Sequence, residues 1–211
     1  MPTIMTHGFV AGLLAKTFAA GRMPSRFWIL SVLCSILPDA DVIGFSFGVR
    51  YEDMLGHRGL SHSLVFALAV SLAVTFLAFS QCPPRWNRLG LLSYFFAVTA
   101  SHGVLDAMTD GGLGVAFFSP FDETRYFFPF RPISVSPIGL SFFSARGLDV
   151  LWSELLWVWL PGTIMAGSVL LSRKLRRPHV DPNSQTEIKP NIEDAQHSVA
   201  SVVEAVLRPK D

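Results

Sequence analysis

Long apolar stretches without charge constrain the fold of this chain more than any other feature of its sequence. Residues 59–84 contain no Asp, Glu, Lys or Arg, and their centre, 64–79, is almost purely apolar. A helix needs about 20 such residues to cross the hydrocarbon core of a bilayer. The whole chain is 50% hydrophobic and only 16% charged, which is too apolar for an ordinary soluble domain. We therefore expect residues 59–84 to form a membrane span.

Further segments have the composition of membrane helices. They are 155–172, 89–105, 27–37 and the weaker stretch 8–20. The last of these is short and contains Lys16, so it could cross the membrane, re-enter it or lie at its surface. A cleaved secretory signal is disfavoured there, because no Lys or Arg precedes the apolar stretch and Lys16 interrupts it.

Together these segments predict one all-α domain in residues 1–172, a polytopic membrane bundle of about four to five helices. Residues 173–211 begin with a basic cluster and continue as a polar tail that contains several prolines. A segment of this composition cannot bury enough apolar surface to fold, so we expect the tail to be mostly disordered.

The distribution of Lys and Arg predicts the orientation of the bundle, because cytoplasmic loops carry an excess of these residues. Three clusters alternate with the segments: Lys16, Arg22 and Arg26; Arg85 and Arg88; and Arg173, Lys174, Arg176 and Arg177. Placing all three in the cytoplasm puts the amino terminus outside and the carboxyl terminus inside. The stretch 109–149 then faces outward, and its length and its many Phe, Pro and Gly residues favour a functional loop, such as a lid on the membrane surface.

Histidines and aspartates stand at the predicted outer ends of the segments. They are His7, Asp39, Asp41, His57, His62, His102 and Asp106. Lys and Arg alone define the orientation, and it nevertheless brings all of these residues to one membrane face. Ionisable groups at membrane depth cost about 2.5–3.5 kcal/mol each on insertion scales and usually mark function. We therefore predict a divalent-metal site at the outer face.

Two of the pairs have spacings that suit metal coordination. His102 and Asp106 are four residues apart and stack on one face of a helix, where a simple hydrogen bond is the alternative. Asp39 and Asp41 share one side if the chain is extended, and Pro38 disfavours helix before it. Asp39 could instead cap a helix. His7 precedes the first segment, and alone it would more often be an interfacial residue than a ligand.

The block from His57 to Ser63 contains the remaining candidates. Gly59 permits a sharp backbone that would turn His57 and His62 inward. Arg58 could lie at the headgroup level or offer its guanidinium fork to a phosphate oxygen. Mixed imidazole and carboxylate ligation suits Zn first, with Mn or Fe as alternatives. A catalytic zinc takes three protein ligands and keeps one position for water, so this many candidates allow one to three ions.

With these residues in view, the chain resembles the LexA-regulated, inner-membrane metal-dependent hydrolase family of bacteria. The resemblance covers roughly the first 170 residues. Its elements are His7, the motif LPDAD at 37–41, the block HRGLSHS at 57–63 and the pair His102-x-x-x-Asp106, in this order. The HRGLSHS block is fairly specific, and the others gain weight from their order.

That family is similar, more remotely, to zinc-dependent phospholipase C and related single-strand nucleases. The similarity implies that His102 and Asp106 are metal ligands. A further His-x-x-x-Glu element of those proteins has no counterpart here, and Glu154 is the candidate for the missing acid. The resemblance thus implies hydrolysis of a phosphoester or lipid-type ester among the lipids of the inner membrane. The candidate catalytic residues are Arg58, His62 and Glu154.

Two other classes of function stay open. A metal or proton transporter would also carry charged residues in its spans, but the middle of 64–79 and of 155–171 is dry and offers no relay to the other face. A scaffold stapled by metal would bind the ion without turnover. The net charge of +1 gives no basic field and so excludes a nucleic-acid partner. The two cysteines form no CxxC pair and predict no thiolate metal site.

Overall fold

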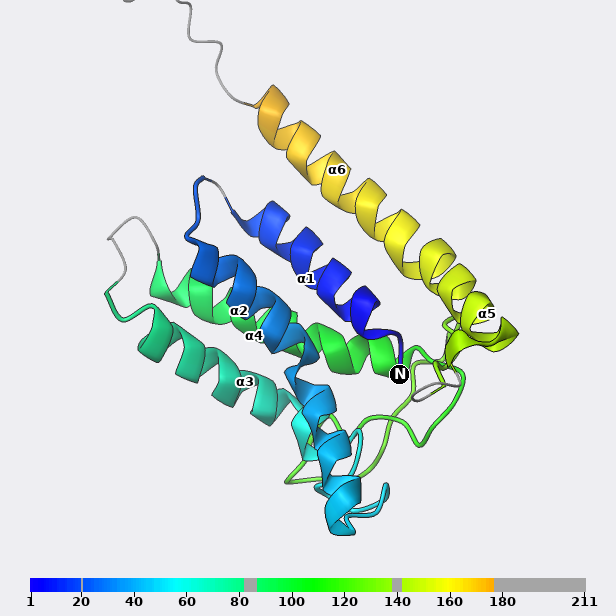
Figure 1. Cartoon of the computed structure of the whole chain (residues 1–211). Helices are drawn as coiled ribbons and strands as arrows, with labels where there is room; N and C mark the ends of the chain where they lie inside the picture. The colour runs from blue at the N-terminus through cyan, green and yellow to red at the C-terminus, as the bar shows by residue number, and fades with distance from the viewer. Residues whose placement is uncertain (20, 82–86, 138–141, 177–211) are drawn as a thin grey trace, which may run out of the picture. The chain divides into compact units, whose positions relative to one another are not determined.

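The computed structural model describes residues 1–19, 21–81, 87–137 and 142–176 (Figure 1). The chain divides into two units, residues 1–171 and 172–211, and the fold described below is that of the first. The predicted disorder of the tail falls almost wholly on residues 177–211, which lie outside the described part of the chain. Arg85, one of the residues used for the orientation, also lies outside it.

The regular secondary structure of the described residues is helical, which confirms the predicted all-α class. The segments are α1 (Ile4–Phe18), α2 (Ser25–Ile36) with the 3-10 helix η1 (Leu37–Phe47), the short η2 (Leu60–His62), α3 (Leu64–Ala73) with the π-helical η3 (Val74–Ala78), α4 (Arg88–Ala107), and α5 (Ala145–Glu154) with the π-helical η5 (Leu155–Trp159) and α6 (Leu160–Leu175). Apart from two isolated bridges, no strand occurs in these ranges.

Within the described residues, three helical stretches are long and apolar enough to cross a membrane: Ser25–Phe47, Arg88–Ala107 and Ala145–Leu175. The run 59–84, expected to be a full span, gives the shorter helix Leu64–Ala78. It begins late because the Ser63 hydroxyl accepts the amide of Phe66 and so caps α3 at that point. The last span begins earlier than its apolar composition indicated, so Glu154 lies inside a helix.

Helix α4 is the centre of the bundle and packs against α1, α2 and α3. Its buried residues Leu91, Tyr94 and Phe95 form a core with Phe27 of α2. The rings of Phe27 and Tyr94 stack at 4.8 Å between centroids, and the Tyr94 hydroxyl donates to Ser31 Oγ at 2.6 Å. A buried phenol needs such a partner, and this bond fixes α2 against α4.

The stretch 109–149 is predicted to be an outward loop, but its end lies in helix α5, and the part 109–137 is partly buried. Val115 and Ile133 are fully buried, and the Ala116 amide donates to the Arg58 carbonyl at 3.0 Å. The Leu64 amide at the start of α3 donates to the Phe117 carbonyl, also at 3.0 Å. These bonds fasten the segment to the HRGLSHS block, so it is a fixed wall of that region; its role as a lid stays a prediction.

Helix α4 approaches η2 so closely that only glycine fits at Gly103. A Cβ at Gly103 would lie 2.9 Å from the His62 carbonyl oxygen, whereas a Cβ at Gly12 of α1 would meet nothing within 4 Å. We expect Gly103→Ala to destabilise the fold by about 1–3 kcal/mol, because the backbone of η2 must shift. Gly12→Ala should be neutral or mildly stabilising, because alanine favours helix. Thermal unfolding of both variants in detergent checks this, and equal melting temperatures would contradict it.

Candidate metal centre

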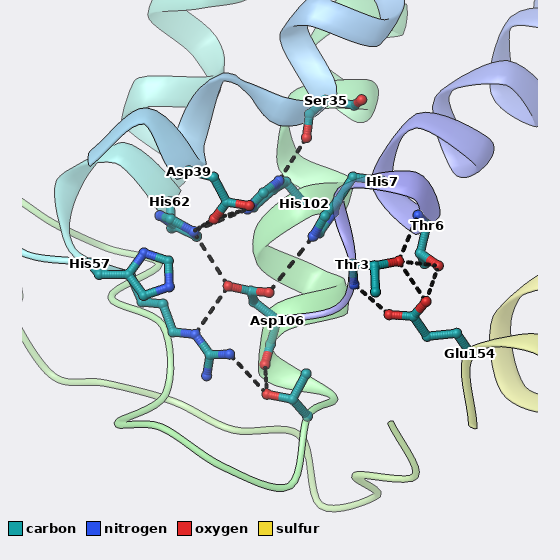
Figure 2. Close-up of polar contacts among 12 residues, drawn as sticks. Thr3, Thr6, His7, Ser35, Asp39, His57, His62, His102, Asp106 and Glu154 are labelled. Atoms are coloured by element: carbon teal, nitrogen blue, oxygen red, sulfur yellow. Dashed lines mark hydrogen bonds and ion pairs between the residues drawn. The ribbon is translucent and has the colours of Figure 1, made fainter. Parts of the chain in front are cut away.

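The structure brings the predicted His and Asp candidates together; Figure 2 labels all of them except Asp41, which contacts His57 and His62. His7 comes from α1, Asp39 and Asp41 from η1, His62 from η2, and His102 and Asp106 from α4, while His57 precedes η2. Segments far apart in the sequence thus supply one compact set of imidazoles and carboxylates. These are the donor groups that zinc and related divalent metals prefer.

Two expectations about the local backbone were wrong. Asp39 and Asp41 lie on the 3-10 helix η1, with Pro38 in its first turn, and not in an extended stretch. A 3-10 helix has three residues per turn, so residues two apart point in different directions. Asp39 accordingly contacts His102, and Asp41 contacts His57. His7 does not precede the first helix but lies within α1, where its ring stacks on that of His102 at 3.7 Å.

A tight turn brings His57 and His62 together. Arg58 has a positive φ of 67°, and a Cβ at Gly59 would lie 2.2 Å from the Met54 carbonyl oxygen, which only glycine avoids. The turn buries both rings, whose centroids are 5.2 Å apart. Gly59 therefore allows the inward direction that its place in the block predicts.

Four residues form what we call the primary cluster: Asp39, His62, His102 and Asp106. The His102 Nε2 atom lies 3.1 Å from both His62 Nε2 and Asp39 Oδ1. The His62 Nε2 atom lies 3.4 Å from Asp106 Oδ2 and 3.6 Å from Asp39 Oδ1. Ligand atoms about 2.0–2.1 Å from a tetrahedral zinc stand about 3.3 Å from one another. The cluster therefore has the spacing of a metal's ligand shell.

Hydrogen bonds behind the two histidines fix the tautomers of their rings. His102 Nδ1 lies 2.7 Å from the Ser35 carbonyl, which only accepts, so Nδ1 carries the proton. The Ser61 hydroxyl donates to Asp41 at 2.5 Å, so its oxygen accepts from His62 Nδ1 at 2.9 Å. In the neutral rings both Nε2 atoms therefore present lone pairs to each other and to Asp39. Only a shared cation, a proton or a metal ion, makes this contact favourable.

Several buried atoms of this region have no hydrogen-bond partner among the described residues. They are both ring nitrogens of His7, Asp39 Oδ2 and both carboxylate oxygens of Asp106. His7 Nε2 lies 3.9 Å from Asp106 Oδ1, within an ion-pair contact but beyond a hydrogen bond. Buried polar atoms are nearly always satisfied, so these atoms fit a cation that would engage them.

We call Asp41, His57 and His62 the supporting cluster. Asp41 Oδ1 lies 2.8 Å from His57 Nδ1, and Asp41 Oδ2 lies 3.2 Å from His62 Nδ1. Because His62 Nδ1 carries a proton, it cannot at the same time ligate a second ion. The supporting cluster therefore has the geometry of carboxylates that orient metal-binding histidines.

The electrostatic field of the carboxylates favours positive charge at His62. Burial lowers the pKa of this imidazole, but its close contacts with the carboxylates of Asp106, Asp39 and Asp41 raise the pKa overall, to about 10. The cause is the excess of anionic oxygens around one ring. A bound divalent cation would satisfy the same excess.

Arg58 does not lie at the headgroup level, because its side chain is only 1% exposed. Its Nε atom lies 3.0 Å from Asp106 Oδ2, and its terminal nitrogens donate to the Gly111 carbonyl and the Thr109 hydroxyl. With all three nitrogens engaged, the guanidinium has no free fork for a phosphate. Its position makes it the counter-charge of Asp106.

Glu154 joins neither cluster. Its buried carboxylate accepts the Thr3 amide, and it accepts the Thr3 and Thr6 hydroxyls at 2.7 Å each. Trp159 adds a bond from its indole nitrogen to the Thr6 hydroxyl at 2.7 Å. Glu154 thus holds the first turn of α1, the helix that carries His7, and does not supply the missing metal ligand or acid.

Two residues that shape the site carry no signal of their own in the sequence. The Ser35 carbonyl orients His102, and a backbone group cannot be recognised from residue type. Ser61 bridges Asp41 and His62, and its place within the HRGLSHS block was the only available sign.

Comparisons with known proteins agree with the membrane assignment. The model of the YdjM inner membrane protein family matches residues 1–177. The chain is 39% identical over 178 residues to the inner membrane protein YbcI of Escherichia coli strain K12. The aligned region covers 82% of this chain and 100% of that protein. No solved structure matches the chain.

The geometry of the primary cluster predicts the metal content of the purified protein. We expect about one to three equivalents of divalent metal, and the pair His102→Ala with Asp106→Ala should remove most of it, because it deletes half of the cluster. Asp149→Ala, which changes an exposed carboxylate on α5, is the matched control and should keep the metal. Elemental analysis after mild purification decides, and a metal-free wild type would sink the prediction.

The shared carboxylate of Asp106 predicts an unusual dependence of stability on metal. Arg58→Met leaves Asp106 without its counter-charge, which typically costs about 3–5 kcal/mol for a buried pair. A bound divalent ion would replace part of that charge, so the loss should be larger in chelator-treated protein than in metal-loaded protein. Melting temperatures of variant and wild type in both states measure the difference, and an equal loss in the two states would argue against a metal next to Asp106.

Proposed function

The chain belongs to the YdjM inner membrane protein family, and we propose that it is a membrane-bound, metal-dependent hydrolase. Its substrate class is a phosphoester or lipid-type ester. The observation that carries the proposal is the primary cluster, in which two imidazole nitrogens and two carboxylates converge within 4.8 Å. Ring nitrogens whose lone pairs face each other repel unless a cation lies between them. The cluster is therefore better suited to binding a cation than to a structural hydrogen-bond network.

Zinc is the proposed ion, with manganese or iron as alternatives, because the ligands are mixed imidazoles and carboxylates. When bound, such an ion lowers the pKa of water to about 7 and so supplies hydroxide at neutral pH. In the proposed reaction the water oxygen attacks phosphorus or the carbonyl carbon. The bond to the leaving alcohol oxygen breaks, and the alcohol departs with one proton of the water while the other stays on the acid product or is released from it.

The residues of the chain have separate tasks in this proposal. Asp39, His62, His102 and Asp106 hold the ion. Asp41 orients the rings of His57 and His62 through their Nδ1 atoms, and Arg58 balances the charge of Asp106. His62, which both clusters share, holds the ion through Nε2 while its Nδ1 atom contacts Ser61 and Asp41, so its contacts do not support the separate catalytic role expected for it. The catalytic roles expected for Arg58 and Glu154 receive no support from their contacts.

The proposed location follows from the same residues. His102 and Asp106 lie in the last turns of Arg88–Ala107, a helix that is long and apolar enough to cross a membrane. The alternation of basic clusters favours the outer face of the inner membrane for the site and the cytoplasm for the carboxyl terminus. A substrate there would meet the enzyme at headgroup depth. The resemblance to LexA-regulated hydrolases and, remotely, to zinc-dependent phospholipase C supports the reaction class.

The test is a screen of soluble phosphomonoesters, phosphodiesters and phospholipids with purified, metal-loaded protein. We expect turnover that a chelator abolishes, that zinc or manganese restores, and that His102→Ala loses at least about a hundredfold. Asp149→Ala should remain active. Bound metal without any turnover would favour a stapled scaffold, and metal-dependent ion flux in liposomes without hydrolysis would favour a transporter; either result would overturn the proposal.

A further inference from the structure

An apolar cleft between α2 and α3 ends at the primary cluster. It has a volume of about 560 Å³, within the range of small-molecule sites. Its lining includes Leu30, Leu33 and Leu37 on the α2 side and Val70 and Val74 on the α3 side. Asp39 is the one charged residue among the residues that line it. A ligand in this cleft would therefore meet polar atoms at one end only.

Asp39 is also the least buried member of the primary cluster. His102 and Asp106 are fully buried and His62 is 3% exposed, whereas Asp39 is 9% exposed. Because Asp39 Oδ1 lies 3.1 Å from His102 Nε2, the Asp39 end of the cleft borders the cluster. Access to the cluster from the cleft thus runs past Asp39.

The direction of the cleft suits an extended hydrocarbon chain. From Leu30 to Leu37 it follows α2 for about 10 Å along the helix axis. Leu33 is 50% exposed, so the cleft opens at the side of the bundle, between Ser25–Phe47 and Leu64–Ala78. In a membrane that side faces lipid chains, and the end at Asp39 lies toward the headgroups.

We propose that this cleft binds an acyl chain of a phospholipid substrate and places its ester linkage beside Asp39. The proposal rests on the hydrolase function proposed above and narrows its substrate to lipids with a long acyl chain. Burial of the acyl chain along the cleft supplies binding free energy. The polar ester linkage then lies at the end of the cleft that contains Asp39. The reaction is the same hydrolysis, in which water adds to the ester and the alcohol leaves.

Two other apolar cavities help to define the test. One of about 410 Å³, lined by Met1, Met5 and Phe143 among others, also touches Asp39 but is formed by the start of α1 and the residues before α5. The other, of about 430 Å³, lies between α1 and η5–α6 and is lined by Val10, Val169 and other residues, none of them His, Asp or Glu. Because the second has the same apolar character but no link to the cluster, it is the internal reference.

The experiment uses the full chain in detergent micelles with a phospholipid that carries a diazirine on one acyl chain. After irradiation, mass spectrometry maps the labelled peptides. We expect labelling of the segments around Leu33 and Val74 to exceed that around Val169. Leu33→Trp should fill the cleft and reduce this labelling severalfold. Ile29→Trp is the matched control, because Ile29 lies one turn away on α2, is 58% exposed and does not line the cleft.

Hydrolysis gives the second reading. Leu33→Trp should lower turnover of a long-chain phospholipid severalfold and leave turnover of a short, water-soluble phosphoester unchanged. Uniform labelling of all exposed apolar faces that Leu33→Trp does not alter would overturn the acyl-chain site, even if short phosphoesters are hydrolysed. Labelling at the cleft that Leu33→Trp abolishes, without hydrolysis of any ester, would keep the lipid site and defeat the hydrolase proposal.

Discussion

The structure depends on the need to neutralise the buried carboxylates of Asp39 and Asp106 inside an apolar bundle. Asp106 is fully buried, and a lone anion there would be too costly to keep. A guanidinium from the HRGLSHS block and imidazoles from α1, η2 and α4 surround these carboxylates. Residues 109–137 form a wall that holds the guanidinium in place. Contacts between opposite charges therefore join these segments at this end, in addition to the apolar core around Phe27 and Phe95.

The clustering of the His and Asp residues could largely be predicted from the sequence, because two independent features of the sequence point to it. Apolar length predicts the helices, and the distribution of Lys and Arg predicts which ends share a face. Together they bring His7, Asp39, His57, His102 and their neighbours to one region without any knowledge of packing, and the structure contains that cluster. The HRGLSHS block adds local geometry, since Gly59 indicates where the chain turns.

What the sequence could not reveal depends on contacts between distant residues or on the backbone. Glu154 has the position expected of a ligand near the outer end of a span, but its carboxylate is consumed by Thr3 and Thr6 at the other end of the chain. Arg58 has the chemistry to bind phosphate, but its partners Thr109 and Gly111 lie in a loop whose path no periodic pattern describes. Asp39 and Asp41 were expected to share one side of an extended chain. They point in different directions because η1 is a 3-10 helix.

Pro38 connects the backbone of α2 to the chemistry of α4. Ser35 lies in the last turn of α2, where the carbonyls have no partner further along the same helix, and Pro38 just beyond it has no amide hydrogen to offer. The Ser35 carbonyl is then free to accept from His102 Nδ1, and that bond decides which nitrogen of His102 faces Asp39. A missing backbone donor in one helix thus selects the tautomer of a side chain in another. An amide hydrogen at position 38 would compete with His102 Nδ1 for the Ser35 carbonyl, so this position acts on the candidate site although it supplies no donor atom to it.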